Sequence, residues 1–259
     1  MIPQIIHYCW LSNDSVPKDF LQNINGWKRV LKNYHFIKWD FSIFDKDSSS
    51  WVSEAFDNKK YAFAADYIRL YALYTIGGIY LDMDIEVIKS FDHLLDYPYM
   101  FAYERPNAPW IEAGCIGAEK GNYFIKKCLD YYNDRHFIKQ DGSLDLLTLP
   151  RIMEKVRAEN EIELSCYPWT YFTAKSYQTG VEYPTSETCC IHHFAGSWKT
   201  AEEKENYKIS QKYSRILGHT IGHNIADYKG AIKKEGVSGI IKMTKKKIIR
   251  KINNKNNTI

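Results

Sequence analysis

The sequence lacks the cysteine patterns of disulfide frameworks and structural zinc sites. Its six cysteines show no C-x-x-C pair and no regular spacing. The N-terminal segment MIPQIIHYCW also lacks the basic start, the long apolar run and the cleavage site of a signal peptide. We therefore expect a reduced, intracellular protein, and not a small secreted one held together by disulfides.

Long hydrophobic runs and internal repeats are missing as well. No uninterrupted apolar run approaches the ~18 residues that cross a bilayer, so the sequence predicts no membrane-spanning helix. At 259 residues, with 45% hydrophobic and 25% charged residues, the chain has the composition of a soluble globular protein. This length fits one large α/β domain, alone or with a tail.

Aromatic residues and one basic segment are what the sequence has in excess. Its 20 tyrosines and 7 tryptophans suit the faces of sugars and nucleobases as well as a hydrophobic core. Residues 231–259 carry nine Lys or Arg against one acid, a local charge of +8, whereas the whole chain carries +4 and the remainder therefore −4. Such a basic end favours an anionic partner, either a membrane surface or nucleic acid.

The first part of the chain alternates between strand and helix patterns. The apolar runs IPQIIHYCW and HFIKWD predict strands, and the helical spacing between them predicts a helix that begins near Pro17. KYAFAADYIRLYALYTIGG predicts the clearest helix, with Gly77 at its C-terminal cap. It leads into IYLDMD, whose apolar run is typical of a strand covered on both faces. This order of elements predicts an α/β fold.

The later segments predict further strands and helices. YMFAYE, AGCIGAE and TCCIHHF predict strands, whereas NYFIKKCLDYYND and LDLLTLPRIMEKV predict helices, the second with Pro150 as a kink or break inside it. Residues 202–217 and the segment from 237 onward predict helices. We expect a main domain over residues 1–200, a helical extension over 201–235 and a basic amphipathic tail over 236–259 whose end is disordered.

Asp82 and Asp84 follow the predicted central strand directly. Ligands of open α/β sheets bind at the carboxyl ends of strands. Residues two apart in a strand point to the same face, so the two acids converge if the strand continues; at a strand end, where the chain bends, either acid can turn aside. Two close carboxylates repel each other, and a divalent cation removes that conflict. Oxygen ligands favour Mg²⁺ or Mn²⁺, which leave positions open for phosphate. The alternative is an ordinary exposed Asp-x-Asp loop, which is common.

Asp66 and Arg69 share a face of the helix before that strand, among apolar residues. One interpretation is an internal ion pair. The other is a donor and an acceptor that lie beside the metal and bind hydroxyls of a polar ligand.

Three segments together resemble the DXD-containing sugar transferases. They are IPQIIHYCW, FAADYIRLYALYTIGGIYLDMD and HHFAGSW. That family includes fungal initiation-specific mannosyltransferases and bacterial capsular polysaccharide synthesis enzymes, and it is more distantly similar to the catalytic domain of clostridial glucosylating toxins. The resemblance implies a GT-A catalytic domain over residues 1–200, a Rossmann-like mixed sheet flanked by helices, here followed by the basic C-terminal helical tail.

The resemblance also implies roles for the residues around the Asp pair. Asp84 would bind Mn²⁺ or Mg²⁺ directly, and Asp82 would reach the ion through water or contact the ribose. Asp66 and Arg69 would hold hydroxyls of the donor sugar. Tyr80 would lie against the nucleotide.

Five further residues match the two outer segments. Trp10 would stack on the base, although a core position is the alternative. His192 and His193 face opposite sides of a strand, so one of them, and we favour His192, would reach the metal. Ser197 and Trp198 would cap the diphosphate.

Two polar loops lie where such an enzyme would place its acceptor. They are YERPNAPWIEAGC and QDGSLDLLTLP. The alternative is a pair of solvated connections. The residues expected to line the acceptor side are Glu104, Asn107, Trp110 and Glu112.

The segment VSGIIKMTKKKIIRKI places apolar residues near one helical face and cations on much of the rest. Such a helix lies in a membrane interface, where each cation adds about 1 kcal/mol near an anionic surface; the alternative is a solvated extension. Nucleic acid is disfavoured as a partner because the tail lacks aromatic residues. The predicted location is cytoplasmic, peripheral at the inner face of the plasma membrane.

Together these features predict a metal-dependent, retaining glycosyltransferase. It would move a hexose or N-acetylhexosamine from a UDP- or GDP-linked sugar to a lipid-linked glycan acceptor. This reaction would belong to capsule or cell-surface polysaccharide synthesis. The metal would stabilise the departing diphosphate, which would act as base for attack on the same face. The alternatives are a Mg²⁺-dependent hydrolase or phosphotransferase acting on a nucleotide-sugar, and a non-enzymatic membrane-associated adaptor.

Overall fold

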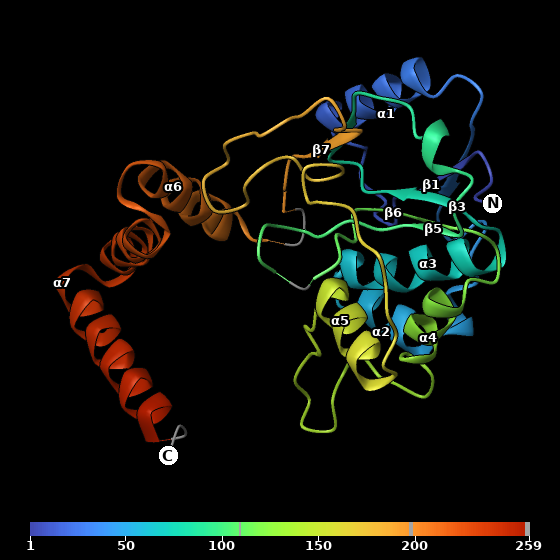
Figure 1. Cartoon of the computed structure of the whole chain (residues 1–259). Coiled ribbons are helices and arrows are strands. Elements are labelled where there is room, and N and C mark those ends of the chain that lie inside the picture. Colours follow the sequence, from blue (N-terminus) through green and yellow to red (C-terminus); the bar gives the residue numbers. More distant parts are fainter. Residues whose placement is uncertain (109, 197–198, 257–259) are drawn as a thin grey trace. The chain divides into compact units, whose positions relative to one another are not determined.

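A computed structural model describes residues 1–108, 110–196 and 199–256, the last eleven of them by backbone alone (Figure 1). The chain forms two compact units, one of residues 1–175 and 182–198 and one of residues 176–181 and 199–259. The domain boundaries predicted at residues 200 and 235 stay predictions. Ser197 and Trp198, predicted to cap a diphosphate, and residues 257–259 of the predicted disordered end lie outside the described residues.

The first unit contains a mixed five-stranded sheet. Its strands are β1 (Ile5–Cys9), β2 (His35–Trp39), β3 (Gly78–Leu81), β5 (Tyr99–Met100) and β6 (Cys115–Ala118). Their order is β2-β1-β3-β6-β5. β1 runs parallel to β2 and β3, whereas β6 runs antiparallel to β3 and β5. The central strand β3 is thus the one that ends at the two acids.

Helices cover both faces of this sheet. They are α1 (Lys18–Val30), α2 (Ser50–Asp57), α3 (Tyr61–Thr75), α4 (Tyr123–Asp130) and α5 (Leu149–Glu159), with short 3-10 turns at Lys46–Ser48 and Asp92–Leu94. Figure 1 shows α2, α3, α4 and α5 on one side of the sheet and α1 on the other. The sheet is therefore the middle layer of three.

Two hydrophobic clusters fill the space between the sheet and these helices. Ile79 and Leu81 of β3 are buried in the cluster that contains Trp27 of α1, whereas Tyr80 lies in the cluster that contains Ile68 of α3. β3 is thus covered on both faces, as predicted from its apolar run, and each such side chain contributes about 1.5–3 kcal/mol by burial. The predicted α/β architecture, a Rossmann-like mixed sheet flanked by helices as in a GT-A fold, is confirmed.

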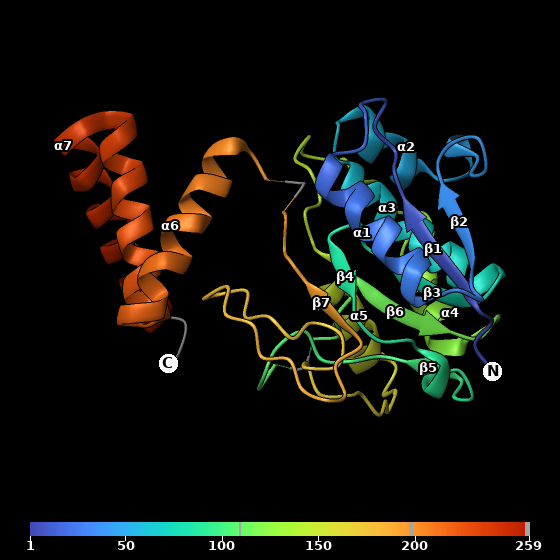
Figure 2. The same ribbon diagram turned by 90° about the horizontal axis from the view of Figure 1, so that it is seen from above.

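A second, two-stranded sheet joins segments that are far apart in the sequence. β4 (Ile85–Val87) pairs antiparallel with β7 (Cys190–His192), in a register that sets Ile85 opposite His192. Figure 2 shows the two strands side by side. This pairing brings the late motif of the sequence next to the Asp-x-Asp segment that precedes β4.

The turn between α3 and β3 depends on a glycine. Gly77 follows the helix with a φ of 79°, in the left-handed region. A Cβ atom at this position would lie 2.6 Å from the backbone nitrogen of Lys120. Gly77 therefore ends the helix, as predicted, and the chain enters β3 at the next residue.

Two predicted elements are shorter in the structure. The helix predicted over LDLLTLPRIMEKV begins at Leu149, so Pro150 lies in its first turn and the predicted internal kink is wrong. Proline fits there because it lacks the N–H that a first turn leaves unpaired, and because its φ is already helical. Of the predicted strand YMFAYE only Tyr99–Met100 pairs with β6, since Ala102 bridges to Tyr167 instead.

The second unit contains two helices, α6 (Ala201–Leu217) and α7 (His219–Asn256). Thr200 is the N-cap of α6 and forms a capping box with Glu203. Gly236, with a φ of 59°, interrupts α7. In the part of the chain that the structure describes, no helix combines the length and the apolar character needed to cross a membrane.

Candidate active site

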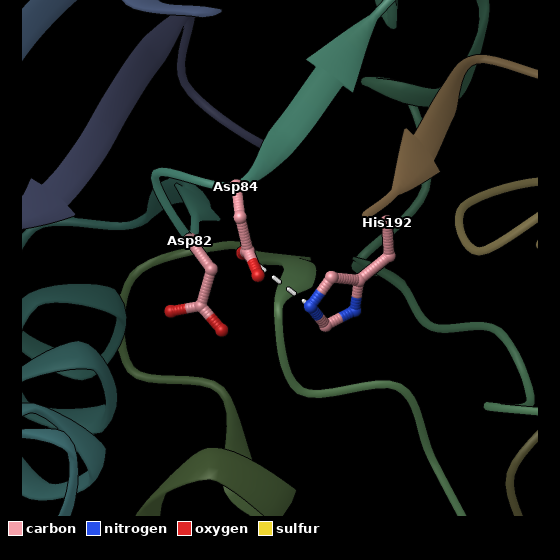
Figure 3. Close-up of side chains that lie close together, drawn as sticks. All are labelled: Asp82, Asp84 and His192. Atoms are coloured by element: carbon pink, nitrogen blue, oxygen red, sulfur yellow. Dashed lines mark ion pairs between the residues drawn. The ribbon is translucent and has the colours of Figure 1, made fainter. Parts of the chain in front are cut away.

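A tight turn carries both acids of the Asp-x-Asp segment. Asp82 follows β3 directly, and its carbonyl accepts a hydrogen bond of 3.0 Å from the N–H of Ile85, which closes the turn before β4. Met83, between the acids, is buried in the hydrophobic core. The carboxylates of Asp82 and Asp84 lie close together (Figure 3).

Helix α1 holds the backbone of this turn. Asn23 donates from Nδ2 to the carbonyl of Met83 at 2.9 Å, and Trp27 donates from Nε1 to the carbonyl of Ile85 at 2.8 Å. A buried carbonyl without a partner would cost free energy, so both bonds favour one backbone path. α1 therefore positions the acids through the residues beside them.

His192 completes a cluster of three possible metal ligands. One ligand atom from each of Asp82, Asp84 and His192 lies within 4.8 Å of the other two. Nε2 of His192, at the end of β7, lies 3.4 Å from Oδ1 of Asp84 (Figure 3). Two carboxylates and an imidazole suit Mn²⁺, and carboxylates also suit Mg²⁺. The residues present thus fit the predicted divalent cation.

A buried carboxylate orients His192. Glu112 is 2% exposed, and its Oε1 lies 3.1 Å from Nδ1 of His192. The same carboxylate accepts hydrogen bonds from the N–H of Gly114 at 2.6 Å and the hydroxyl of Thr173 at 3.1 Å. A proton on Nδ1 that faces Glu112 leaves Nε2 to face the acids, an arrangement that commonly supports a metal-binding histidine.

This geometry changes the role assigned to Glu112. We predicted that Glu112 lines the acceptor, but its carboxylate is enclosed by His192, Gly114 and Thr173. A side chain so buried and so fully bonded does not present oxygens to an acceptor. We therefore reassign Glu112 to the positioning of His192.

Gly114 allows these groups to approach one another. A Cβ atom on this residue would lie 2.8 Å from Oε1 of Glu112, 3.0 Å from Oδ2 of Asp82 and 3.0 Å from Cε1 of His192. The carbonyl of Gly114 also accepts a hydrogen bond of 2.7 Å from the N–H of Asp82. The close packing of the site therefore requires glycine at this position.

Asp66 and Arg69 form an ion pair that reaches Asp82. Nη2 of Arg69 lies 3.0 Å from Oδ1 of Asp66 and 3.2 Å from Oδ1 of Asp82. Nη1 donates to the carbonyl of Ala113 at 2.7 Å, and the guanidinium lies 4.5 Å from the ring centroid of Tyr80. The Arg69 side chain is only 6% exposed. Arg69 therefore balances two carboxylates of the site from within the protein.

The charges of the cluster shift its pKa values in different directions. Burial raises the pKa of Asp82, against the opposing charge of Arg69. Burial acts on Asp84 as well, but the charge and hydrogen bond of His192 hold the pKa of Asp84 at about 2. Although burial favours a neutral imidazole, the charges of Glu112 and Asp84 raise the pKa of His192 well above its usual value. Binding of a cation would therefore release a proton from His192.

His193 contacts a different set of side chains. Its Nε2 lies 2.9 Å from Oε2 of Glu86, and its Nδ1 lies 3.1 Å from Nζ of Lys175. Of the two histidines considered for the metal, the structure brings His192 to the acids and places His193 in this other group.

Tyr80 lies on β3, and Trp10 follows the neighbouring strand β1. Trp10 follows β1, and its ring packs edge to face with Phe20 at 6.2 Å. Tyr80 is buried beneath Arg69, and its hydroxyl donates to Oδ1 of Asp82 at 3.1 Å. Their predicted contacts with the base and the nucleotide stay predictions.

The loop between Tyr103 and Ile111 carries the other residues predicted to line the acceptor. A bridge between these two residues closes the loop, and Asn107 adopts a φ of 56° within it. Acceptor binding by Glu104, Asn107 and Trp110 stays a prediction.

Residues 17–101 match a family model described as a glycosyltransferase sugar-binding region containing a DXD motif. Asp82 and Asp84 lie inside the matched residues and form the motif. This region belongs to the DXD-containing glycosyltransferase family. The DXD region contains Asp66, Arg69 and both acids, whereas Glu112 and His192 lie beyond it.

Two curated fungal proteins are similar to the part of the chain around the DXD region. Inositol phosphoceramide mannosyltransferase 3 of Schizosaccharomyces pombe is 32% identical over 48% of this chain and 35% of that protein. Mannosyl phosphorylinositol ceramide synthase SUR1 of Saccharomyces cerevisiae is 29% identical over 53% of this chain and 37% of that protein. The chain thus spans about a third of the length of these relatives.

Among solved structures, the PaToxG glycosyltransferase matches with 19% identity and a TM-score of 0.46, over 61% of this chain and 69% of that chain.

We expect Glu112→Gln to weaken metal binding. Glutamine keeps the shape of the side chain but removes the charge that holds the Nδ1 proton of His192, and loss of such support lowers metal affinity about tenfold to hundredfold. Calorimetric titration of Mn²⁺ in the presence of a nucleoside diphosphate measures this change. Thr173→Val is the matched control, because it removes one hydrogen bond to Glu112 and leaves its charge. Equal Mn²⁺ affinity in the wild type and Glu112→Gln would contradict the positioning role.

Proposed function

We propose that this chain is a metal-dependent glycosyltransferase that uses a nucleoside-diphosphate sugar as donor. The cluster of Asp82, Asp84 and His192 carries this proposal, because it places two carboxylates and an imidazole at the end of the central strand. Asp84 and His192 would hold Mn²⁺ or Mg²⁺, with Asp82 beside them. When bound, the ion supplies positive charge for the diphosphate that leaves the sugar.

Three other buried side chains of the site, Asp66, Arg69 and Glu112, also have roles in this proposal. In this proposal the remaining lone pairs of Asp66 accept hydroxyls of the donor sugar, and Arg69 holds Asp66 in place through their ion pair. Arg69 also fixes Asp82 by two contacts, and Glu112 fixes His192. A site whose side chains are held before the substrate arrives needs little rearrangement during the reaction.

We propose transfer with retention of configuration. In this reaction the bond between the sugar C1 and the phosphate oxygen breaks, and the acceptor oxygen forms a new bond to C1 on the same face. The acceptor hydroxyl gives its proton to the departing phosphate. NMR of the product anomer tests this proposal directly.

The names of the two fungal relatives support a more specific donor and acceptor. Both describe transfer of mannose to a phosphoinositol ceramide, so mannose is the first sugar to test and a lipid-linked acceptor is the first class to test. Val237 and Ile241 of α7 are 74% and 54% exposed, beside the basic segment, which suits contact with an anionic membrane. A peripheral place at the inner face of the plasma membrane, and a part in capsule or cell-surface glycan synthesis, belong to the same proposal.

A panel of UDP- and GDP-linked sugars tests the proposed function. The purified chain, with Mn²⁺ and a lipid-phosphate acceptor, is expected to release nucleoside diphosphate from one donor and to add its sugar to the acceptor. EDTA is expected to stop the release. A rate that does not change with acceptor, and gives free sugar alone, would favour a hydrolase. No release from any donor, while the metal and nucleotide fail to bind, would favour the non-enzymatic alternative.

A further inference from the structure

Trp110 lies between two arginine side chains. The guanidinium carbon of Arg151 is 3.5 Å from the centroid of the indole ring, and that of Arg105 is 4.1 Å from it. Two guanidinium groups so close to one centroid cannot share a face of the ring, so they flank it on opposite sides. This stacking leaves the N–H edges of both groups available for a ligand beside the ring.

Neither guanidinium forms an ion pair within the described residues. By contrast, Arg69 pairs with Asp66, and Arg157 on the same helix as Arg151 pairs with Glu154. Glu104 precedes Arg105 in the chain. Burial raises the pKa of Glu104 to about 7, although the charges of Arg105 and Arg151 both lower it. Within the part of the chain that the structure describes, the charges of these two arginines are thus not matched by an ion pair.

Glu104 links the arginine pair to the metal cluster. Its backbone N–H donates to the carbonyl of Trp110 at 2.8 Å. Besides burial, the charges of Glu112 and His192 act on the pKa of Glu104 together with those of Arg105 and Arg151, so both groups lie around this one side chain. The loop that carries Trp110 and the first turn of α5, which carries Arg151, meet at the indole ring. An anion held there would be a neighbour of the sugar that is transferred at the cluster.

We propose that Arg105 and Arg151, held in place by Trp110, bind a phosphate group of the acceptor next to the site of transfer. This inference rests on the proposed function. Planar guanidinium groups bind two phosphate oxygens at once, and two of them on either side of one ring offer a paired fork. Since the donor diphosphate belongs to the metal cluster, we assign the phosphate on the arginines to the acceptor. The same chemistry could serve the donor, and the experiment separates the two sources.

Binding of methyl phosphate to the full chain, followed by ³¹P NMR, tests this proposal. The titration is made with Mg²⁺ and a nucleoside diphosphate at saturating concentration, so that the donor site is filled. We expect saturable binding by the wild type and at least about tenfold weaker binding by Arg105→Gln and by Arg151→Gln. Arg151→Lys keeps the charge without the planar fork and is expected to lie between. Arg157→Gln, on the same helix, is the matched control and is expected to bind as the wild type does.

Three outcomes would overturn the proposal. Methyl phosphate binding that is unchanged in both glutamine variants, or absent in the wild type, would exclude a phosphate site on these arginines. Weaker binding of the nucleoside diphosphate in Arg105→Gln and Arg151→Gln, measured by calorimetry, would assign the arginines to the donor. Failure of the proposed function would give a different result. The wild-type chain would then bind no nucleoside diphosphate with Mg²⁺ or Mn²⁺, yet it would still bind methyl phosphate.

Discussion

Asp84→Asn is expected to lower kcat/KM for sugar transfer about a thousandfold or more, equivalent to roughly 4 kcal/mol of transition-state stabilisation. Asparagine keeps an oxygen for the N–H of Ala195, which Oδ2 of Asp84 accepts at 2.7 Å. It removes the charge that makes Asp84 the strongest acid of the cluster, with a pKa held at about 2 by His192. Steady-state kinetics with the donor found in the panel measures the loss, and circular dichroism checks the fold.

Glu86→Gln is the matched control for this substitution. Glu86 lies two residues further along the chain, is exposed and pairs with His193, outside the metal cluster. We expect the control to transfer sugar at the wild-type rate. A folded Asp84→Asn protein with turnover like that of the control would contradict the role of Asp84.

Arg69→Met is expected to lower the free energy of unfolding by about 3–5 kcal/mol. Methionine approximates the volume of the side chain but leaves Asp66 and Asp82 without the cation that they share. The carbonyl of Ala113 also loses its donor. Urea denaturation followed by tryptophan fluorescence measures the change.

Arg157→Met provides a matched comparison, because Glu154 and Arg157 are also three residues apart on a helix and the Arg157 side chain is 35% exposed. Solvent screens that pair, so we expect the loss to stay below about 1 kcal/mol. In Arg69→Met, a further Asp66→Asn substitution is expected to recover part of the stability by removing one buried charge. Equal losses in Arg69→Met and Arg157→Met would show that burial does not set the cost.

The parts of the fold and site that depend on neighbouring residues could be predicted from the sequence. Gly77 marks the end of α3 because few other residues adopt its φ, and the apolar run before Asp82 marks a strand covered on both faces. The spacing of Asp82 and Asp84 predicts that they lie together only if the strand continues through them, whereas in the structure a turn after β3 brings them together. His192 could be favoured over His193 only through the resemblance, since alternation along a strand does not say which face holds the acids.

The remaining parts depend on contacts between distant segments. Glu112 was interpreted as an acceptor residue because its segment lies where the resembled enzymes place their acceptor loops, and only the structure shows that its carboxylate meets His192, 80 residues further along the chain. Nothing in the sequence around Gly114 indicates that a glycine is required there. The requirement comes from three side chains that would lie too close to a Cβ atom at this position. The stacking of Arg151 on Trp110 likewise requires α5 to lie against the loop.

Diffraction at the manganese absorption edge, from crystals grown with Mn²⁺ and a nucleoside diphosphate, tests the central claim most directly. We expect one anomalous peak bonded to Asp84 and His192, close to Asp82, and shared with oxygens of the diphosphate. An anomalous peak elsewhere on the chain, or none while Asp82 and Asp84 stay bound to Arg69 and His192 alone, would contradict it.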